Sequence, residues 1–310
     1  GLFQAFMGTS SRKSENPGCT LLKKGEKYKM EYLYHYTSLD TLALILSNKT
    51  ICFNNLLYVD DIEEARTQDM GLFGRFKYVS CWTADSEESI PLWNMYTPNM
   101  HGVRIRLPKY PFKKYYYKKG DFHLSKDEET YINFKKFYLD NKASIVLSDP
   151  QLVKVDYTDE YHKLFPQVRK ESYPGAVRDF LQAKKLEDLK GKNINVSYDH
   201  KKLGRFKREN WEFQKEWRYI ITLNPIGLQE VFYSDFECQQ KLIRMVEDRE
   251  LEPPYKKIFL DLDENFFVHM EIVFGPKMSE AEKIMAKALL KYFCPNCPYR
   301  ESTLQIRKIP

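Results

Sequence analysis

Apolar and polar positions alternate most clearly between Lys215 and Leu223. Every second side chain there is apolar and falls on one face of a strand, with Glu216 and Arg218 on the other face. Weaker alternation and short apolar runs bounded by turn residues predict further strands. These predicted strands span 32–37, 51–53, 77–82, 103–107, 152–157, 257–260 and 271–274.

Helices are predicted where apolar residues recur at helical spacing behind a residue that can cap a helix. Ser38 or Asp40 can cap a helix over 41–47. Ser279, with Glu282 three residues later, forms the pattern of a capping box at the start of the last helix. The predicted helices span 41–47, 60–68, 90–96, 128–139, 176–189 and 279–292.

The order of these elements favours one folded domain of the α+β class. Short strands and helices are mixed without regular βαβ alternation, and the sequence contains no internal repeat. We predict a domain over residues 28–293, with an insertion at about 120–205. Residues 1–27 are expected to form a flexible N-terminal extension, and residues 294–310 a C-terminal tail.

Composition excludes several classes of protein. Of the 310 residues, 43% are hydrophobic and 15% aromatic, so the chain is too apolar for a disordered protein. No apolar run approaches the roughly 20 residues that cross a bilayer, and residues 1–10 lack the pattern of a cleavable signal. Six cysteines in a chain of this length favour reduced thiols over a disulfide scaffold. We therefore expect a cytoplasmic protein without a membrane partner.

Basic residues are concentrated between residues 101 and 120. The whole chain has 49 basic and 43 acidic residues, a net charge of +6, which by itself says little about partners. Residues 101–120 contain seven Lys or Arg and no acid, interleaved with Tyr and Phe. One interpretation is a nucleic-acid surface, with lysines on phosphates and tyrosines stacked on bases, whose affinity falls steeply with salt. The other is a solvated lysine-rich loop with its tyrosines packed inward.

Several standard motifs are missing from the sequence. No glycine-rich Rossmann or P-loop motif is present, and neither H-E-x-x-H nor G-x-S-x-G occurs. Cys294 and Cys297 have the spacing of zinc ligands, but no second Cys or His pair lies near them in the sequence. Asp261, Asp263 and Glu271 provide a weaker alternative, a nuclease that needs Mg²⁺. We predict no metal site.

Three separated segments contain histidine, tryptophan, tyrosine and carboxylate groups. They are Tyr34–Thr37, Trp93–Tyr96 and Trp211–Arg218. Taken singly, each has a simple structural interpretation. The first would contain a packed histidine, the second a core stripe on a helix, and the third a surface pair between Glu216 and Arg218 worth under about 1 kcal/mol.

In combination, the segments resemble a bacterial family of domains of unknown function related to the ADP-ribosyltransferase superfamily. The resemblance covers about 30–290 discontinuously, and the order of the short motifs gives it most of its specificity. The matching motifs are His35–Leu39, Ile51–Asn54 leading to Asp60–Asp61, Ser80–Trp82, Leu92–Tyr96, His101–Val103, Trp211–Arg218 and Ile272–Pro276.

The resemblance implies an α+β fold with a split β-sandwich and peripheral helices. In this fold NAD binds between the two sheets of the sandwich. It implies that Glu216 is the catalytic residue and that His35 contacts the ribose hydroxyls, while Tyr96 or Trp93 stacks on nicotinamide. In many relatives a glycine follows the histidine, whereas Tyr36 takes that place here. The residues expected to bind NAD are His35, Tyr36, Thr37, Ser80, Trp93 and Tyr96.

The residue types suit the transfer of ADP-ribose. Breaking the bond between ribose and nicotinamide develops positive charge on the ribose, which a nearby carboxylate stabilises. Glu216 could also deprotonate the incoming nucleophile if burial raises its pKa. Gln214 would lie on the same strand face, as in the Gln-x-Glu pattern that some transferases use to orient the acceptor. The residues expected at the acceptor are Gln214, Lys113, Lys114, Tyr115 and Lys118.

The resemblance therefore predicts an NAD-dependent ADP-ribosyltransferase that uses no metal. Its acceptor would be a macromolecule, with nucleic acid favoured slightly over protein. Relatives of this kind often act as toxins or in phage defence, which implies an inhibitory antitoxin partner. Two alternatives stay open: an NAD glycohydrolase, and a non-catalytic nucleic-acid or protein binding module on the same fold.

Overall fold

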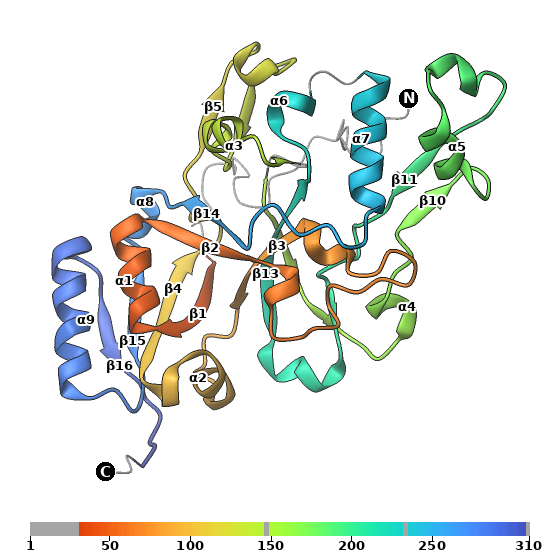
Figure 1. Cartoon of the computed structure of the whole chain (residues 1–310). Helices are drawn as coiled ribbons and strands as arrows, with labels where there is room; N and C mark the ends of the chain where they lie inside the picture. Colours follow the sequence, from red (N-terminus) through yellow and green to blue (C-terminus); the bar gives the residue numbers. More distant parts are fainter. Residues whose placement is uncertain (1–30, 146–148, 232–234, 308–310) are drawn as a thin grey trace, which may run out of the picture.

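A large open sheet forms the centre of the molecule (Figure 1). The computed structural model describes residues 31–145, 149–231 and 235–307. The strands follow the order β14-β2-β3-β1-β4-β15-β16, and β13 pairs with β3 and is joined by β7 and β8. The strands of this sheet are β1 (Tyr32–Ser38), β2 (Thr50–Asn55), β3 (Lys77–Thr83), β4 (Gly102–Pro108), β7 (Ser144–Ile145), β8 (Gln151–Lys154), β13 (Glu216–Asn224), β14 (Lys257–Asp261), β15 (Glu271–Phe274) and β16 (Tyr299–Glu301).

The sheet forks at β3. One edge of β3 pairs with β13 along its whole length, from Thr83 opposite Glu216 to Lys77 opposite Thr222. The other edge is shared, because β2 pairs only with its first half and β1 only with its last residue, through Tyr34 opposite Thr83. The strands β1 and β2 therefore diverge along one edge of β3, and the residue after Tyr34 lies at the opening.

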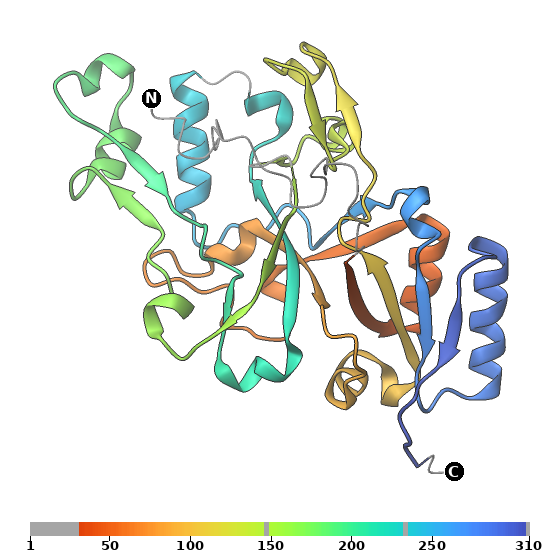
Figure 2. The same cartoon turned by 180° about the vertical axis from the view of Figure 1, so that it is seen from behind.

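Helices cover the sheet at both ends, as the two opposite views show (Figures 1 and 2). The helices α1 (Leu39–Asn48) and α9 (Glu280–Phe293) lie side by side next to β1, β4 and β15, and α5 (Ala176–Gln182) contacts α7 (Phe236–Glu247) at the other end. No helix in the described ranges is long and apolar enough to span a bilayer. The shorter helices are α2 (Ile90–Tyr96), α3 (Phe134–Asp140), α4 (Tyr161–Leu164), α6 (Leu228–Val231) and α8 (Glu264–Phe267).

Three small strand pairs extend from the large sheet. The hairpin of β5 (Tyr115–Tyr117) and β6 (Glu128–Thr130) is antiparallel, as is the pair of β10 (Arg169–Glu171) and β11 (Val196–Tyr198). The pair of β9 (Asp156–Tyr157) and β12 (Phe206–Lys207) is parallel. This last pair lies beside the start of β13, because the Glu216 main-chain N–H donates to the Tyr157 hydroxyl.

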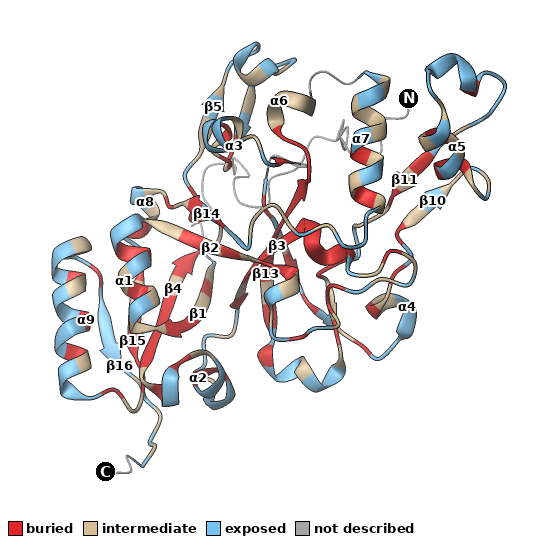
Figure 3. Cartoon of the chain, viewed as in Figure 1, coloured by how far each residue is buried: buried red, intermediate tan, exposed pale blue. Residues whose placement is uncertain are grey.

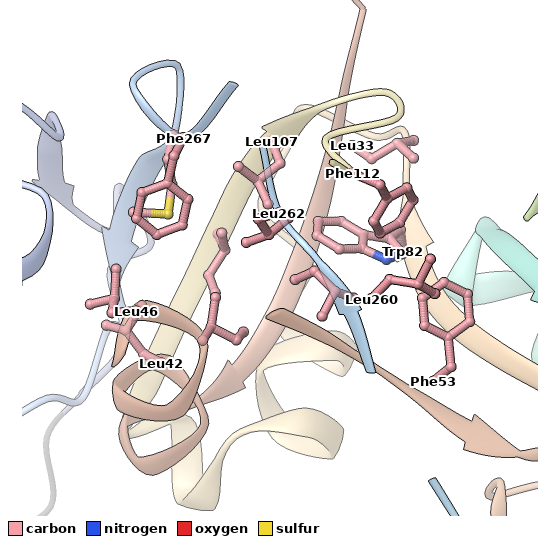
Figure 4. Close-up of a cluster of buried hydrophobic side chains, with 14 of the residues drawn as sticks. Leu33, Leu42, Leu46, Phe53, Trp82, Leu107, Phe112, Leu260, Leu262 and Phe267 are labelled. Atoms are coloured by element: carbon pink, nitrogen blue, oxygen red, sulfur yellow. The ribbon is translucent and has the colours of Figure 1, made fainter. Parts of the chain in front are cut away.

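The main core lies between the sheet and α1, α8 and α9. The central strands are buried along most of their length, whereas α9 and β16 expose most of their outer surface (Figure 3). Burying each large apolar side chain contributes roughly 1.5–3 kcal/mol, so this cluster fixes the relative positions of the strands. Its members include Leu33, Leu42, Leu46, Phe53, Trp82, Leu107, Phe112, Leu260, Leu262 and Phe267 (Figure 4).

Elements with strong local signals are confirmed. Every predicted strand falls on an observed one, with 152–157 divided between β8 and β9. Ser38 caps α1, and Ser279 and Glu282 form the predicted capping box of α9. The mixture of short helices with a large mixed sheet agrees with the predicted α+β class.

Three predicted helices need correction. The predicted acidic helix over 60–68 is wrong, because the segment forms turns in which the Asp61 carboxylate accepts from the Glu63 N–H. Residues 128–130 form β6 and the helix begins only at Phe134. The predicted helix over 176–189 ends at Gln182, and a 3₁₀ turn follows.

The predicted C-terminal tail and the predicted insertion both contain strands of the large sheet. The predicted N-terminal extension, residues 1–27, lies outside the described residues. Within the predicted C-terminal tail, β16 pairs with β15, and within the predicted insertion, β8 pairs with β13. Both segments thus contribute strands to the large sheet.

Candidate functional site

His35 and Glu216 lie on the two strands that flank the end of β3. His35 Nδ1 donates to the Cys81 carbonyl oxygen at 2.9 Å, and its ring lies 5.0 Å from the Trp82 ring. Burial lowers the pKa of His35, which is therefore neutral at pH 7. Because Nδ1 is the protonated nitrogen, Nε2 is left as a hydrogen-bond acceptor, as a ribose hydroxyl requires.

Glu216 belongs to a buried cluster of four charges. Its Oε1 accepts from Arg218 Nε at 2.7 Å, and its Oε2 from Lys207 Nζ at 2.9 Å. Glu64 completes the cluster, because it pairs with Arg218 and lies 3.2 Å from Lys207 Nζ. Arg218 is 0% exposed, so the simple interpretation of Glu216 and Arg218 as a surface pair is wrong. Two carboxylates and two cations balance each other inside the fold, as buried charges require.

The cluster holds Glu216 in its ionised form. Burial raises the pKa of this carboxyl, but Arg218 and Lys207 lower it more, and the net direction is downward. The Cys81 thiol is also hydrogen bonded to Glu216, and burial raises the pKa of that thiol. The arrangement therefore provides a fixed, negatively charged group beside a neutral thiol and a neutral histidine.

Gln214 and Tyr96 are connected to the same cluster. Gln214 lies at the end of a 3₁₀ turn (Glu209–Gln214), and Lys215 takes left-handed backbone angles with φ of 43° before β13 begins. Gln214 Oε1 accepts from Lys207 Nζ at 2.8 Å, and its Nε2 donates to the Tyr96 hydroxyl at 2.7 Å. Tyr96 ends α2, is half-buried, and is hydrogen bonded to Asp60. Burial raises the pKa of Tyr96, so its hydroxyl keeps its proton at pH 7.

The other predicted NAD-binding side chains are enclosed. Trp93 is 0% exposed and packs edge-on against Tyr36 with ring centroids 4.9 Å apart. A fully buried indole has no free face for nicotinamide, so Tyr96 is the better candidate of the two predicted stacking residues. Thr37 and Ser80 are also buried, and the Ser80 hydroxyl accepts from Trp82 Nε1 at 3.0 Å.

The lysine-rich end of the basic stretch, on and next to the β5–β6 hairpin, lies away from this cluster, whereas its first part forms β4 beside β1. The β5–β6 hairpin projects at the top of Figures 1 and 2, whereas α2 and the turn before β13 lie at the bottom. Of the predicted acceptor residues, only Gln214 is connected to Glu216, because Lys207 donates a hydrogen bond to each of them. The other four lie on or next to the hairpin: Lys113, Lys114, Tyr115 and Lys118.

Many charges of the basic stretch already have partners. Arg104 is buried with its guanidinium 4.7 Å from the centre of the Tyr34 ring, and Arg106 pairs with Glu271 at 3.0 Å. The lysines that pair with acids are Lys109 with Glu31, Lys114 with Glu129 and Lys118 with Asp127. The Tyr115 hydroxyl is hydrogen bonded to Asp261.

Sequence reasoning missed Lys207 and Glu64 as parts of the site, and it assigned no role there to Asp60, which belongs to one of the matching motifs. Lys207 lies in a basic run over 201–208, and Glu64 and Asp60 lie in the segment predicted as an acidic helix over 60–68. The signal that could have found them is charge balance, since a buried carboxylate on a strand needs cationic partners from elsewhere.

The alternative metal ligands do not meet in the structure. Asp261 binds Tyr115 and Lys136, the Asp263 side chain caps α8, and Glu271 pairs with Arg106. In the parts of the chain that the structure describes, no group of three or more His, Cys, Asp or Glu side chains could hold a metal ion.

Comparisons with models of known protein families, with curated proteins and with solved structures gave no match.

Proposed function

We propose that the chain is an NAD-dependent ADP-ribosyltransferase with Glu216 as its catalytic residue. One observation supports the proposal most strongly: three segments that the resemblance assigns to one site meet in the fold. His35, Tyr96 and Glu216 come from β1, α2 and β13, and hydrogen bonds through Cys81, Gln214 and Lys207 connect them. In this proposal the fork beside β3 is the split between the two sheets of the transferase fold.

The proposed chemistry breaks the bond between the ribose carbon and the nicotinamide nitrogen. The bonding electron pair leaves with nicotinamide, and the acceptor forms a new bond to the same carbon and releases a proton to water. Glu216 stabilises the positive charge that develops on the ribose. Because its pKa is lowered, we assign Glu216 this electrostatic role rather than that of a base.

The remaining residues have positioning and binding roles in this proposal. His35 Nε2 accepts from a ribose hydroxyl, Tyr96 stacks on nicotinamide, and Gln214 orients the acceptor. The acceptor is a macromolecule, either nucleic acid or protein. A role as a toxin or phage-defence effector with an inhibitory partner comes from the resemblance alone.

The test measures nicotinamide release from NAD by the purified protein, with and without RNA, DNA or lysate protein. We expect Glu216→Gln to lower the rate on the order of 10²–10³-fold, the effect of losing one group that stabilises the transition state. Glu212→Gln is the matched control, because Glu212 is exposed and lies four residues earlier in the chain. Thermal unfolding of each variant shows whether the fold is kept, and Tyr96→Phe tests the site without removing a charge.

A second candidate function is a non-catalytic binding module on the same fold. Both oxygens of Glu216 are already bonded to buried cations, an arrangement that also occurs in purely structural ion networks. This function predicts no nicotinamide release under any condition and no NAD binding by calorimetry. That result, with folded protein, would exclude the transferase.

A further inference from the structure

Lys207 contacts three acceptors of the cluster at once. Its Nζ lies 2.8 Å from Gln214 Oε1, 2.9 Å from Glu216 Oε2 and 3.2 Å from Glu64 Oε1. The side chain is 4% exposed. An ammonium group has three hydrogens to donate and no acceptor, so these three oxygens satisfy it completely.

This contact decides which way the Gln214 amide points. Because Lys207 can only donate, the amide oxygen and not the nitrogen faces it. The amide nitrogen then faces Tyr96, and it donates to the Tyr96 hydroxyl at 2.7 Å. Lys207 therefore connects and orients a series of hydrogen-bonded side chains: Glu216 on one side, and Gln214 followed by Tyr96 on the other.

We propose that Lys207 is a positioning residue of the transferase site, holding the Gln214 amide and the Glu216 carboxylate in the orientations that the reaction needs. The inference rests on the proposed function, and it adds a residue to the site that the resemblance does not include.

The backbone around Lys207 supports this role. Lys207 ends β12, which pairs in parallel with β9, so that Lys207 lies opposite Tyr157. The Tyr157 hydroxyl accepts from the Glu216 main-chain N–H at 2.8 Å, and the Lys207 carbonyl accepts from the Thr158 N–H at 2.8 Å. The same small strand pair thus holds Glu216 through its main chain and through its side chain.

Replacing Lys207 also changes the charge around Glu216. The titratable groups that face this carboxylate are Lys207, Arg218, Glu64, Cys81, Tyr157 and Tyr96. Without Lys207, two buried carboxylates share one cation, so the pKa of Glu216 moves upward. If Lys207 only filled space, an apolar side chain of the same shape would replace it, and the reaction would show no change in its pH dependence.

The experiment compares Lys207→Met and Lys207→Arg with Lys215→Met. Lys215 is the matched control, because its side chain is exposed and its Nζ pairs with Asp85 Oδ2 at 2.7 Å. We expect Lys207→Met to lower kcat about 100-fold, the scale of a misplaced reacting group, and to move the acid limb of the pH profile upward. Lys207→Arg should recover part of the rate, and Lys215→Met should match the unaltered protein. Unchanged kcat, KM and pH profile in Lys207→Met would overturn the inference.

A second measurement separates failure of this inference from failure of the proposed function. The side-chain amide of Gln214 is observed by ¹⁵N NMR and identified by its loss in Gln214→Glu. If the unaltered protein cleaves NAD but the Gln214 signals are the same in Lys207→Met, only the positioning role of Lys207 is wrong. If the unaltered protein neither binds nor cleaves NAD, the transferase itself is wrong, and the positioning role falls with it.

Discussion

At the scale of single residues, Lys77 is a buried amine outside the candidate site. Its Nζ lies 2.7 Å from Thr222 Oγ1 and 2.8 Å from His200 Nδ1, both neutral partners. Burial, together with the nearby charge of Arg205, lowers the pKa of Lys77 to about 7, and the Asp199 charge offsets only part of this. Burial likewise lowers the pKa of His200 to about 3, so this ring stays neutral above pH 7.

The lowered pKa makes the stability of the protein depend on pH. Between pH 7 and the ordinary lysine value of 10.5, the unfolded chain binds a proton at Lys77 that the folded chain does not. Stability therefore rises with pH in this window, by roughly 1.4 kcal/mol per pH unit. We predict that the free energy of unfolding in urea increases from pH 7 to pH 9 relative to that of Lys77→Met. Parallel values for the two proteins would contradict a neutral Lys77.

At the scale of elements, hydrogen bonds to Glu88 hold residues 300–303 of the C-terminal segment against the rest of the fold. Its carboxylate is 4% exposed and accepts from the Thr303 N–H at 3.0 Å, from Arg300 at 3.1 Å and from Ser302 at 2.5 Å. Beyond these contacts, Leu304 and Ile306 pack against the buried apolar cluster that includes Tyr36 and Trp93, against which Tyr96 also packs. The segment that follows β16 thus supports the wall of the candidate site.

Removing the negative charge of Glu88 should loosen this segment. Hydrogen bonds to a charged group contribute a net stabilisation of about 1.5–3 kcal/mol each, after their exchange with water is counted. We predict that Glu88→Gln speeds amide hydrogen exchange over 300–306, whereas Glu87→Gln, at an exposed neighbour, leaves it unchanged. The measurement is exchange followed by mass spectrometry. Equal exchange in both variants would show that the apolar contacts alone hold the segment.

The elements that the sequence predicted correctly are those with local signals. The alternation in β13 and the capping box at Ser279 depend on residues a few positions apart. The segment over 60–68 has acids and helix formers, but its structure depends on distant partners. Glu64 pairs with Arg218, and Ala65 lies so close to Gly74 that a Cβ there would come within 2.5 Å of the Ala65 Cα. No local pattern contains that information.

At the scale of the whole molecule, the candidate site exists because the sheet forks at β3. The resemblance selected His35, Tyr96 and Glu216, and the fold brings them together. It did not select Lys207, whose partners Glu64 and Glu216 are 143 and 9 residues away in the chain. A buried charge cluster can be predicted only once the strand pairing that encloses it is known.

The distribution of charge over the molecule bears on the choice of acceptor. Of the seven basic side chains in residues 101–120, five are buried or paired with acids, which leaves Lys113 and Lys119 for phosphates. Each phosphate contact adds about 0.7 to the slope of log affinity against log salt for a single strand. We therefore predict a slope below about 2 in magnitude for single-stranded RNA, measured by fluorescence anisotropy from 50 to 300 mM salt. A slope near 5 would contradict this count, because it would mean that the ion pairs of residues 101–120 break on binding and that the whole stretch contacts the RNA backbone.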